Sequence, residues 1–135
     1  GVLAAVTQLG EVLEIYNLKD STHVVRIGPH GEPKFKVAEG YGIPTGIMGF
    51  CDVQVTDSAI YAVFQGRTFK DIAEAAQKGD MTDGGRYVYV FSLEGEPLRK
   101  YGLDHVVYSV FIDKLDKIII AIDVNMDSPI LLFSS

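Results

Sequence analysis

The chain has 135 residues, of which 47% are hydrophobic and 22% are charged, enough for one folded domain with a real core. Its formal net charge of −6, with lysines and arginines mostly scattered singly, argues against a nucleic-acid backbone or an anionic membrane surface as partner. The single cysteine, Cys51, excludes an intrachain disulfide and lies in an apolar run, where we expect a buried, inert thiol.

The first third of the chain predicts three strands followed by a loop. Residues 3–6 read as an apolar strand, and residues 10–28 read as an aromatic strand, a turn and a polar strand. Glycines and prolines then punctuate residues 33–47, which predicts a loop without secondary structure.

The middle of the chain predicts two strands, a helix and two further strands. Residues 52–57 alternate between apolar and polar, and residues 59–64 form an apolar strand. Thr68 with Asp71 resembles a capping box, and Gly79 is a suitable stop, so we expect a helix over residues 69–78. The aromatic strand of residues 86–91 leads through a glycine turn to a polar outer strand at residues 98–101.

The strand pattern repeats along the chain. Tyr16, Phe91 and Phe133 align with the residues around them, and the last two lie 42 residues apart, the period of a four-stranded propeller blade. The first two lie 75 apart, which requires an insertion of about 33 residues on that period. Val53 and Val55 match Val110 and Ile112 at an offset of 57 residues. The inner strands are therefore expected at residues 52–56 and 108–113.

These repeats predict an all-β fold of antiparallel four-stranded propeller blades, forming a partial propeller with one short inserted helix. The blade units span about 1–33, 49–104 and 105–135 within a single domain, and the insertion spans 67–85. The first unit lacks its first strand and the third lacks its last, which leaves about two and a half blades. We therefore expect a piece of a longer protein, or copies that self-associate through open blade edges.

Three segments resemble the TolB-like six-bladed propeller proteins of Bacteroides-type bacteria. They are FCDVQVTDSAIYAVFQG at 50–66, RYVYVFSLEGEPLRKYGLDHVVYSVFID at 86–113, and residues 117–133. Residues 26–32 resemble the family's Gly-Pro-Gly-Glu linker, with His30 departing from its order. The resemblance implies a structural fold and a place at the cell envelope, in the periplasm or outside the cell, often with a lipid anchor. It implies no reaction.

The candidates for metal binding are acidic. Asp52, Asp57, Asp104, Asp113 and Asp116 lie at the ends of the expected inner strands, which in a propeller converge on a central channel. Asp52 and Asp113 are the channel candidates for a divalent metal, although Asp is also an ordinary turn residue. We assign no metal and no cofactor. His23, His30 and His105 lack the spacing of a zinc site and are interpreted as solvated turn residues.

No motif for covalent or phosphate chemistry is present. The glycine-rich run at 40–46 is interrupted by Pro44 and lacks a following GK[ST], and no G-x-S-x-G elbow occurs. Tyr87, Tyr89 and Phe91 alternate on one strand face, where they would either stack on sugar rings or pack between blades. Packing is the favoured interpretation, with Phe91 buried between adjacent sheets.

Two functions fit these observations. The first is a non-enzymatic module that binds a protein or a glycan, with the loop at 33–47 and the helix at 69–78 as its recognition surface. The alternative is a lactonase-like or hydrolase-like enzyme with a divalent metal in the central channel. Neither nucleic acid nor membrane insertion is expected, and no apolar run approaches the ~20 residues of a membrane-spanning helix.

Overall fold

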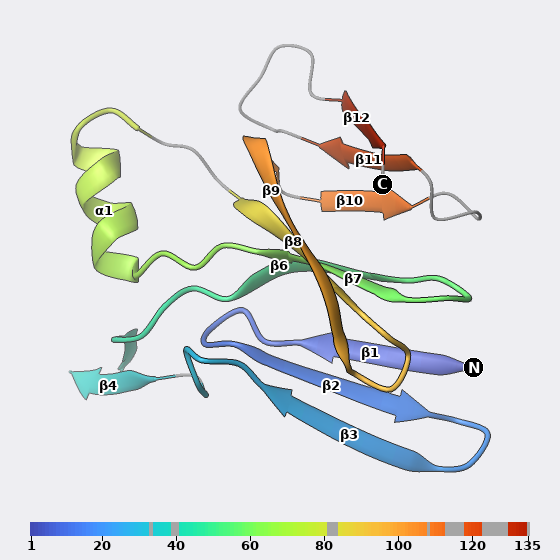
Figure 1. Ribbon diagram of the computed structural model, residues 1–135. Helices are drawn as coiled ribbons and strands as arrows, with labels where there is room; N and C mark the ends of the chain where they lie inside the picture. Colours follow the sequence, from blue (N-terminus) through green and yellow to red (C-terminus); the bar gives the residue numbers. More distant parts are fainter. Residues whose placement is uncertain are drawn as a thin grey trace.

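The computed structural model describes residues 1–32, 34–38, 41–80, 84–107, 109–112, 118–122 and 130–134. Within these residues there are twelve strands and one helix, and the strands form antiparallel sheets of three, four, three and two strands. The three larger sheets follow one another through the molecule in chain order (Figure 1). This arrangement confirms the predicted all-β class, a partial propeller with one short helix.

The first sheet consists of β1 (Val2–Val6), β2 (Val12–Asn17) and β3 (Thr22–Ile27), in that order. Successive side chains of a strand point to opposite faces of the sheet, and Leu13 and Ile15 of β2, each 2% exposed, mark the buried face. The turn between β1 and β2 contains Gly10 with a φ of 73°, a left-handed conformation that glycine adopts without steric cost.

The second sheet is a complete four-stranded blade. Its order is β6 (Phe50–Val55), β7 (Ile60–Phe64), β8 (Gly85–Phe91) and β9 (Pro97–Val107). Every residue of β7 is buried, which explains why this strand reads as a continuous apolar run instead of alternating. The outer strand β9 begins at Pro97 and is longer than the expected 98–101, because it pairs with β8 as far as Val107 opposite Gly85.

Both faces of the second sheet are covered. Tyr61 and Val63 of β7 face the third sheet, in a cluster with Val110 and Ile112. The opposite face of β7 carries Ile60, which packs in a cluster with residues of the first sheet. The third sheet comprises β10 (Ser109–Ile112), β11 (Ile118–Ile122) and β12 (Ile130–Ser134).

The face of β8 toward the first sheet is less buried than the sequence suggests. Val88 and Val90 are fully buried on the side of the third sheet. Phe91 does pack between the first and second sheets, as expected, but it is only half-buried. Tyr89 is also half-buried, and Tyr87 is 40% exposed. The aromatic face of β8 therefore packs between sheets at one end and opens to solvent at the other.

The inserted helix α1 (Phe69–Gln77) matches the predicted bounds closely. Thr68 Oγ1 accepts a hydrogen bond from the backbone N–H of Asp71 at 3.0 Å, as an N-cap does. At the other end, Gly79 has a φ of 91°, and its N–H donates to the carbonyl of Ala76. The Asp80 N–H donates to the carbonyl of Ala75, which completes a Schellman motif. Among the described residues, no helix is both long and apolar enough to cross a membrane.

The predicted loop at 33–47 contains a hairpin instead. β4 (Phe35–Ala38) and β5 (Tyr41–Pro44) pair with each other in a separate two-stranded sheet. Glycine and proline suggested a loop, but Pro44 lies at the end of an edge strand, where its missing N–H removes no internal hydrogen bond.

Candidate ligand-binding clefts

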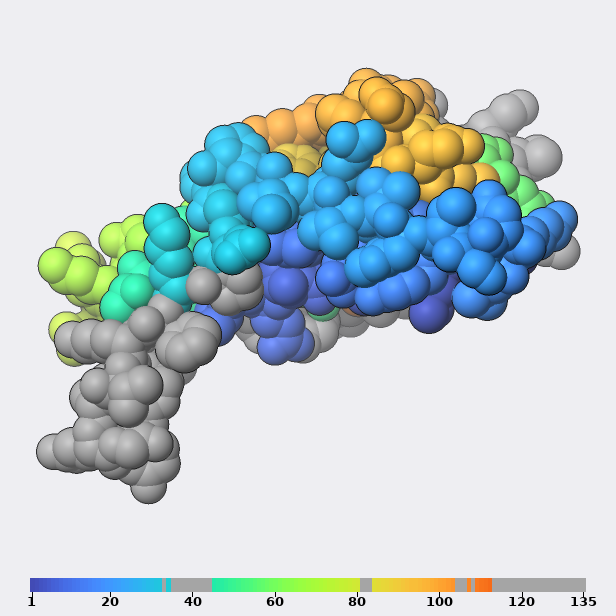
Figure 2. Space-filling view, turned by 90° about the horizontal axis from the view of Figure 1, so that it is seen from below, coloured from blue at the N-terminus to red at the C-terminus, as the bar shows by residue number. Residues whose placement is uncertain are grey.

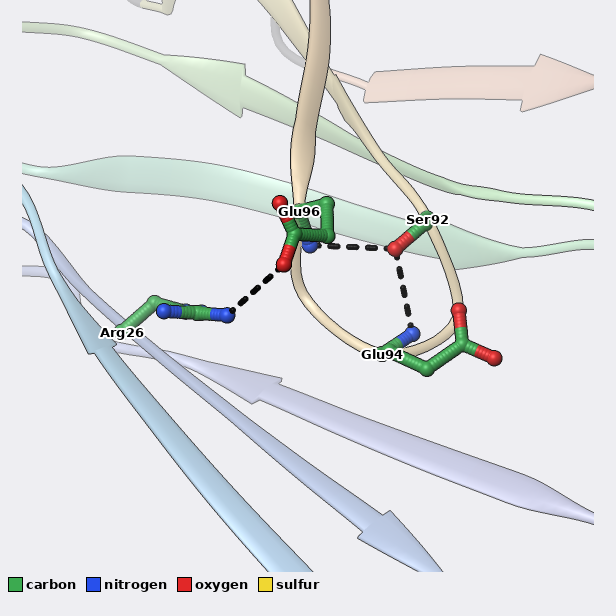
Figure 3. A network of polar contacts seen from close by, with 4 residues as sticks. All are labelled: Arg26, Ser92, Glu94 and Glu96. Atoms are coloured by element: carbon green, nitrogen blue, oxygen red, sulfur yellow. Dashed lines mark hydrogen bonds and ion pairs between the residues drawn. The ribbon is translucent and has the colours of Figure 1, made fainter.

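The turn between β8 and β9 reaches across to the first sheet. Ser92 Oγ accepts hydrogen bonds from the backbone N–H groups of Glu94, at 3.3 Å, and Glu96, at 3.0 Å, which shapes the turn (Figure 3). The Glu96 carboxylate then lies 3.5 Å from Arg26 Nη2 on β3. Gly95 at the tip has a φ of 92° and leaves no spare room, since a Cβ there would touch Ile15 and Arg26. The two sheets are therefore bridged at this end.

A cleft of about 590 Å³ lies between β3 and the β8–β9 pair, and we refer to it as the inter-sheet cleft. Tyr89 and Phe91 of β8 line it with aromatic surface. Cationic side chains also line it: Arg26 from the first sheet, and Arg99 and Lys100 from the second. In Figure 2 the segments around β3, in blue, and around β9, in orange, lie against each other on this face. The cleft combines apolar walls with a few charged groups, as small-ligand sites do.

Glu11 lines the same cleft and is 7% exposed. Its Oε2 accepts a hydrogen bond from the backbone N–H of His30 at 3.1 Å, which satisfies part of this buried carboxylate. Gly28 lies directly against the carboxyl group, and a Cβ at this position would overlap it. The linker at 28–31 is thus folded around the Glu11 side chain.

Tyr89 joins the aromatic residues into one cluster. Its ring stacks on Phe64 at 4.9 Å between centroids and meets Phe50 edge to face at 6.0 Å. The His30 ring in turn stacks on Phe64 at 5.8 Å. Desolvation, with smaller contributions from Glu11 and Tyr87, raises the pKa of Tyr89 to about 12, so its phenol is a neutral hydrogen-bond donor at ordinary pH.

Lys100 is held above two tyrosine rings. Its Nζ lies 4.4 Å from the Tyr87 centroid and 5.4 Å from the Tyr89 centroid, both within the range of a cation–π contact. Cross-strand pairing causes this, because Lys100 lies opposite Tyr89 in the β8–β9 register.

A second cleft, of about 520 Å³, shares Tyr89 and Lys100 with the inter-sheet cleft. Arg67, Arg86, His30 and Tyr87 also line it, and Asp80 contributes a carboxylate. We refer to it as the arginine cleft. Arg67 and Asp80 flank the helix, but among the described residues none from the expected recognition surface, the loop at 33–47 and the helix at 69–78, lines either cleft.

The histidines differ from the prediction. His30 does lie in a turn, but His23 is in β3 and His105 is in β9. His23 stacks on Tyr16 at 4.3 Å, and its Nε2 lies 3.8 Å from Glu14 Oε1. The expected turn position was therefore wrong for His23 and His105, because β3 includes residue 23 and β9 extends past residue 105, whereas His23 is exposed as expected.

The acidic channel candidates are not brought together within the described residues. Asp52 lies in β6, where its Oδ2 accepts hydrogen bonds from Ser109 Oγ at 3.1 Å and from the Val110 N–H at 3.0 Å. Asp57 is exposed in the β6–β7 turn, and Asp104 lies inside β9 instead of at the end of an inner strand. Asp113 and Asp116 fall outside the described residues. No group of three metal-ligating side chains occurs in the part that the structure describes.

Cys51 is half-buried in β6 and packs against the cluster between the second and third sheets. Sequence reasoning identified the aromatic residues of β8, but it missed Glu11 and Arg26. One signal for Glu11 was present in the sequence, namely the two glycines of the linker, Gly28 and Gly31. Gly28 lies against the Glu11 carboxyl group, where a Cβ would not fit, and Gly31 has a positive φ. Arg26 had no local signal, because its role depends on the turn that contacts it from the next sheet.

The stacked antiparallel sheets, one of them a complete four-stranded blade, define a propeller-type protein. The chain belongs to the family described as TolB-like 6-blade propeller-like, whose model matches residues 1–115. A comparison with curated proteins gives no significant match. The family description states an architecture and no activity, so it leaves the choice between binding and catalysis open.

Proposed function

We propose that this chain is a non-enzymatic binding part of a propeller at the cell envelope, with a glycan as its ligand. The observation that carries the proposal is the inter-sheet cleft, in which Tyr89 and Phe91 lie beside Arg26, Arg99 and Lys100. Aromatic rings pack against the C–H faces of sugar rings, and cationic side chains donate hydrogen bonds to sugar oxygens.

The dimensions of the cleft favour a glycan over a protein ligand. Its volume of about 590 Å³ is in the range of pockets that enclose small molecules. A stable protein partner would instead require about 800 Å² of contact surface on this chain. The envelope location rests on the family resemblance.

The experiment is a screen of the purified chain on an array of neutral and acidic bacterial and plant oligosaccharides, followed by calorimetry on the strongest ligand. Arg26→Ala and Leu98→Ala change residues that line the inter-sheet cleft and are exposed enough to leave the fold intact. Each should weaken binding by about tenfold or more. The matched control is Lys70→Ala, because Lys70 lies on α1 and its side chain is 84% exposed. Failure of a folded chain to bind any glycan, or equal binding by all variants, would overturn the proposal.

A further inference from the structure

The arginine cleft is a local exception to the charge of the chain. The whole sequence has a formal net charge of −6, whereas the residues that line this cleft include three cations and one carboxylate. Within the described residues, neither Arg86 nor Lys100 makes an ion pair. A concave, positively charged site on an acidic protein selects for anionic groups, because they are repelled elsewhere on the surface.

Two of the side chains that line the cleft are already positioned. The Lys100 ammonium is placed over the Tyr87 and Tyr89 rings, and His30 is stacked on Phe64 while its backbone N–H is fixed by Glu11. Less side-chain freedom is then lost when a ligand binds. Arg86 is the exposed second residue of β8 and supplies a planar fork that matches the two oxygens of a carboxylate.

We propose that the arginine cleft binds the carboxylate of an acidic sugar, so that the ligand is a glycan containing uronic acid. The carboxylate lies between Arg86 and Lys100, and the neutral Tyr89 phenol is a further donor beside it. This inference rests on the proposed function for its sugar-binding surface. It adds a separate site, because Arg86 lines only the arginine cleft and Arg26 lines only the inter-sheet cleft.

A carboxylated sugar is favoured over an acidic peptide by the residues that the two clefts share. Tyr89 and Lys100 line both, so an aromatic ring that can pack against a sugar lies beside a cation that can bind its carboxylate. An acidic peptide would satisfy the cations but would leave the aromatic wall without a flat apolar partner.

The experiment is calorimetry of the whole chain with four probes: tetragalacturonate, the neutral galactose tetramer, a tetraglutamate peptide and inorganic phosphate. Tetragalacturonate should bind at least tenfold more tightly than each of the other three. Arg86→Ala and Lys100→Ala should each lower its affinity by about tenfold, and Arg86→Lys should restore only part of the loss, because an ammonium cannot replace the fork. Raising the salt concentration should weaken binding to the wild type more than to Arg86→Ala.

The control is again Lys70→Ala, which adds no change near either cleft and should bind like the wild type. Equal affinity for the acidic and neutral tetramers, with no effect of Arg86→Ala, would overturn this inference and leave the inter-sheet cleft untouched. Binding of tetraglutamate or phosphate as tight as tetragalacturonate would also overturn it. A loss in Arg26→Ala without a loss in Arg86→Ala would support the proposed function alone.

Discussion

Asp52 and Ser109 occupy equivalent positions in two consecutive inner strands, and the Ser109 hydroxyl donates a hydrogen bond of 3.1 Å to the Asp52 carboxylate. The same carboxylate oxygen accepts from the Val110 N–H at 3.0 Å. Two residues that the repeat makes equivalent, 57 positions apart in the sequence, are therefore also in direct contact. A residue that the sequence offered as a channel metal ligand joins the second sheet to the third.

Asp52→Ala should destabilise the chain by ~1.5–3 kcal/mol, since it removes hydrogen bonds to a charged acceptor and leaves the Val110 N–H unsatisfied. Asp52→Asn keeps an oxygen in the same place and should cost less. Asp57→Ala, in an exposed turn of the same blade, is the control and should change the free energy of unfolding by less than ~0.5 kcal/mol. Denaturant unfolding measures all three, and equal stability of Asp52→Ala and Asp57→Ala would contradict this role.

Calcium is expected to leave the melting temperature unchanged, because the Oδ2 atom of Asp52 is engaged by β10. A metal that binds only the folded chain would raise the melting temperature with concentration. Thermal unfolding with and without calcium, combined with metal analysis of the purified protein, makes the comparison. Stabilisation that disappears in Asp52→Asn would favour the alternative of a metal-dependent enzyme.

The limits of the sequence prediction follow from how local each signal is. The bounds of α1 were predictable, because Thr68, Asp71 and Gly79 make their capping contacts within a few residues. The blades were predictable because equivalent strands repeat. The β4–β5 hairpin was missed, since its glycine and proline favour a loop by local propensity.

The clefts could not be predicted in the same way. Arg26 and Glu96 meet only after two sheets have packed, and nothing near either residue in the sequence indicates that contact. Lys100 reaches Tyr87 and Tyr89 through cross-strand register, which follows from the turn at Gly95. The residue types on β8 therefore suggested an aromatic face, but its partial exposure depended on tertiary packing.

Gly85→Ala should destabilise the chain by ~1–3 kcal/mol or more, because a Cβ at this position would overlap the backbone carbonyl of Phe64. The backbone of a buried strand cannot move aside as a flexible side chain can. Gly102→Ala in β9 is the matched control, since the nearest atom to its Cβ would be 4.0 Å away, at Tyr87. Thermal melts should show a clear loss for the first and none for the second. Two similar melts would show that β7 and β8 are not as close as described.

Tyr89 should ionise late in an alkaline titration. Its pKa of about 12 lies above the ordinary value of 10.0, chiefly because desolvation disfavours the phenolate. The unfolded chain loses this proton at lower pH than the folded chain, so the contribution to stability is present below pH 10 and is lost as the pH rises toward 12. Absorbance at 295 nm follows the ionisation, and Tyr89→Phe should remove one late step of the titration. A titration of unchanged shape in Tyr89→Phe would contradict the assignment.

The helix should be dispensable for folding. No residue of α1 is buried, Phe69 is 49% exposed, and Figure 1 shows the helix beside the sheets instead of between them. Replacing residues 69–80 with Gly-Asn keeps Thr68 and its bridge to Ile47, and it joins the ends of β7 and β8 by a shorter connection. Loop closure then favours folding slightly, by ~0.6 kcal/mol per halving of loop length.

Circular dichroism should show an intact β signal with a melting temperature close to that of the full chain, whereas binding of an acidic ligand changes because Asp80 leaves the arginine cleft. Thr68→Ala is the control, since it weakens only the N-cap by ~1 kcal/mol and should leave the melt of the sheets unaltered. Loss of the β signal in the replacement would show that the insertion belongs to the core.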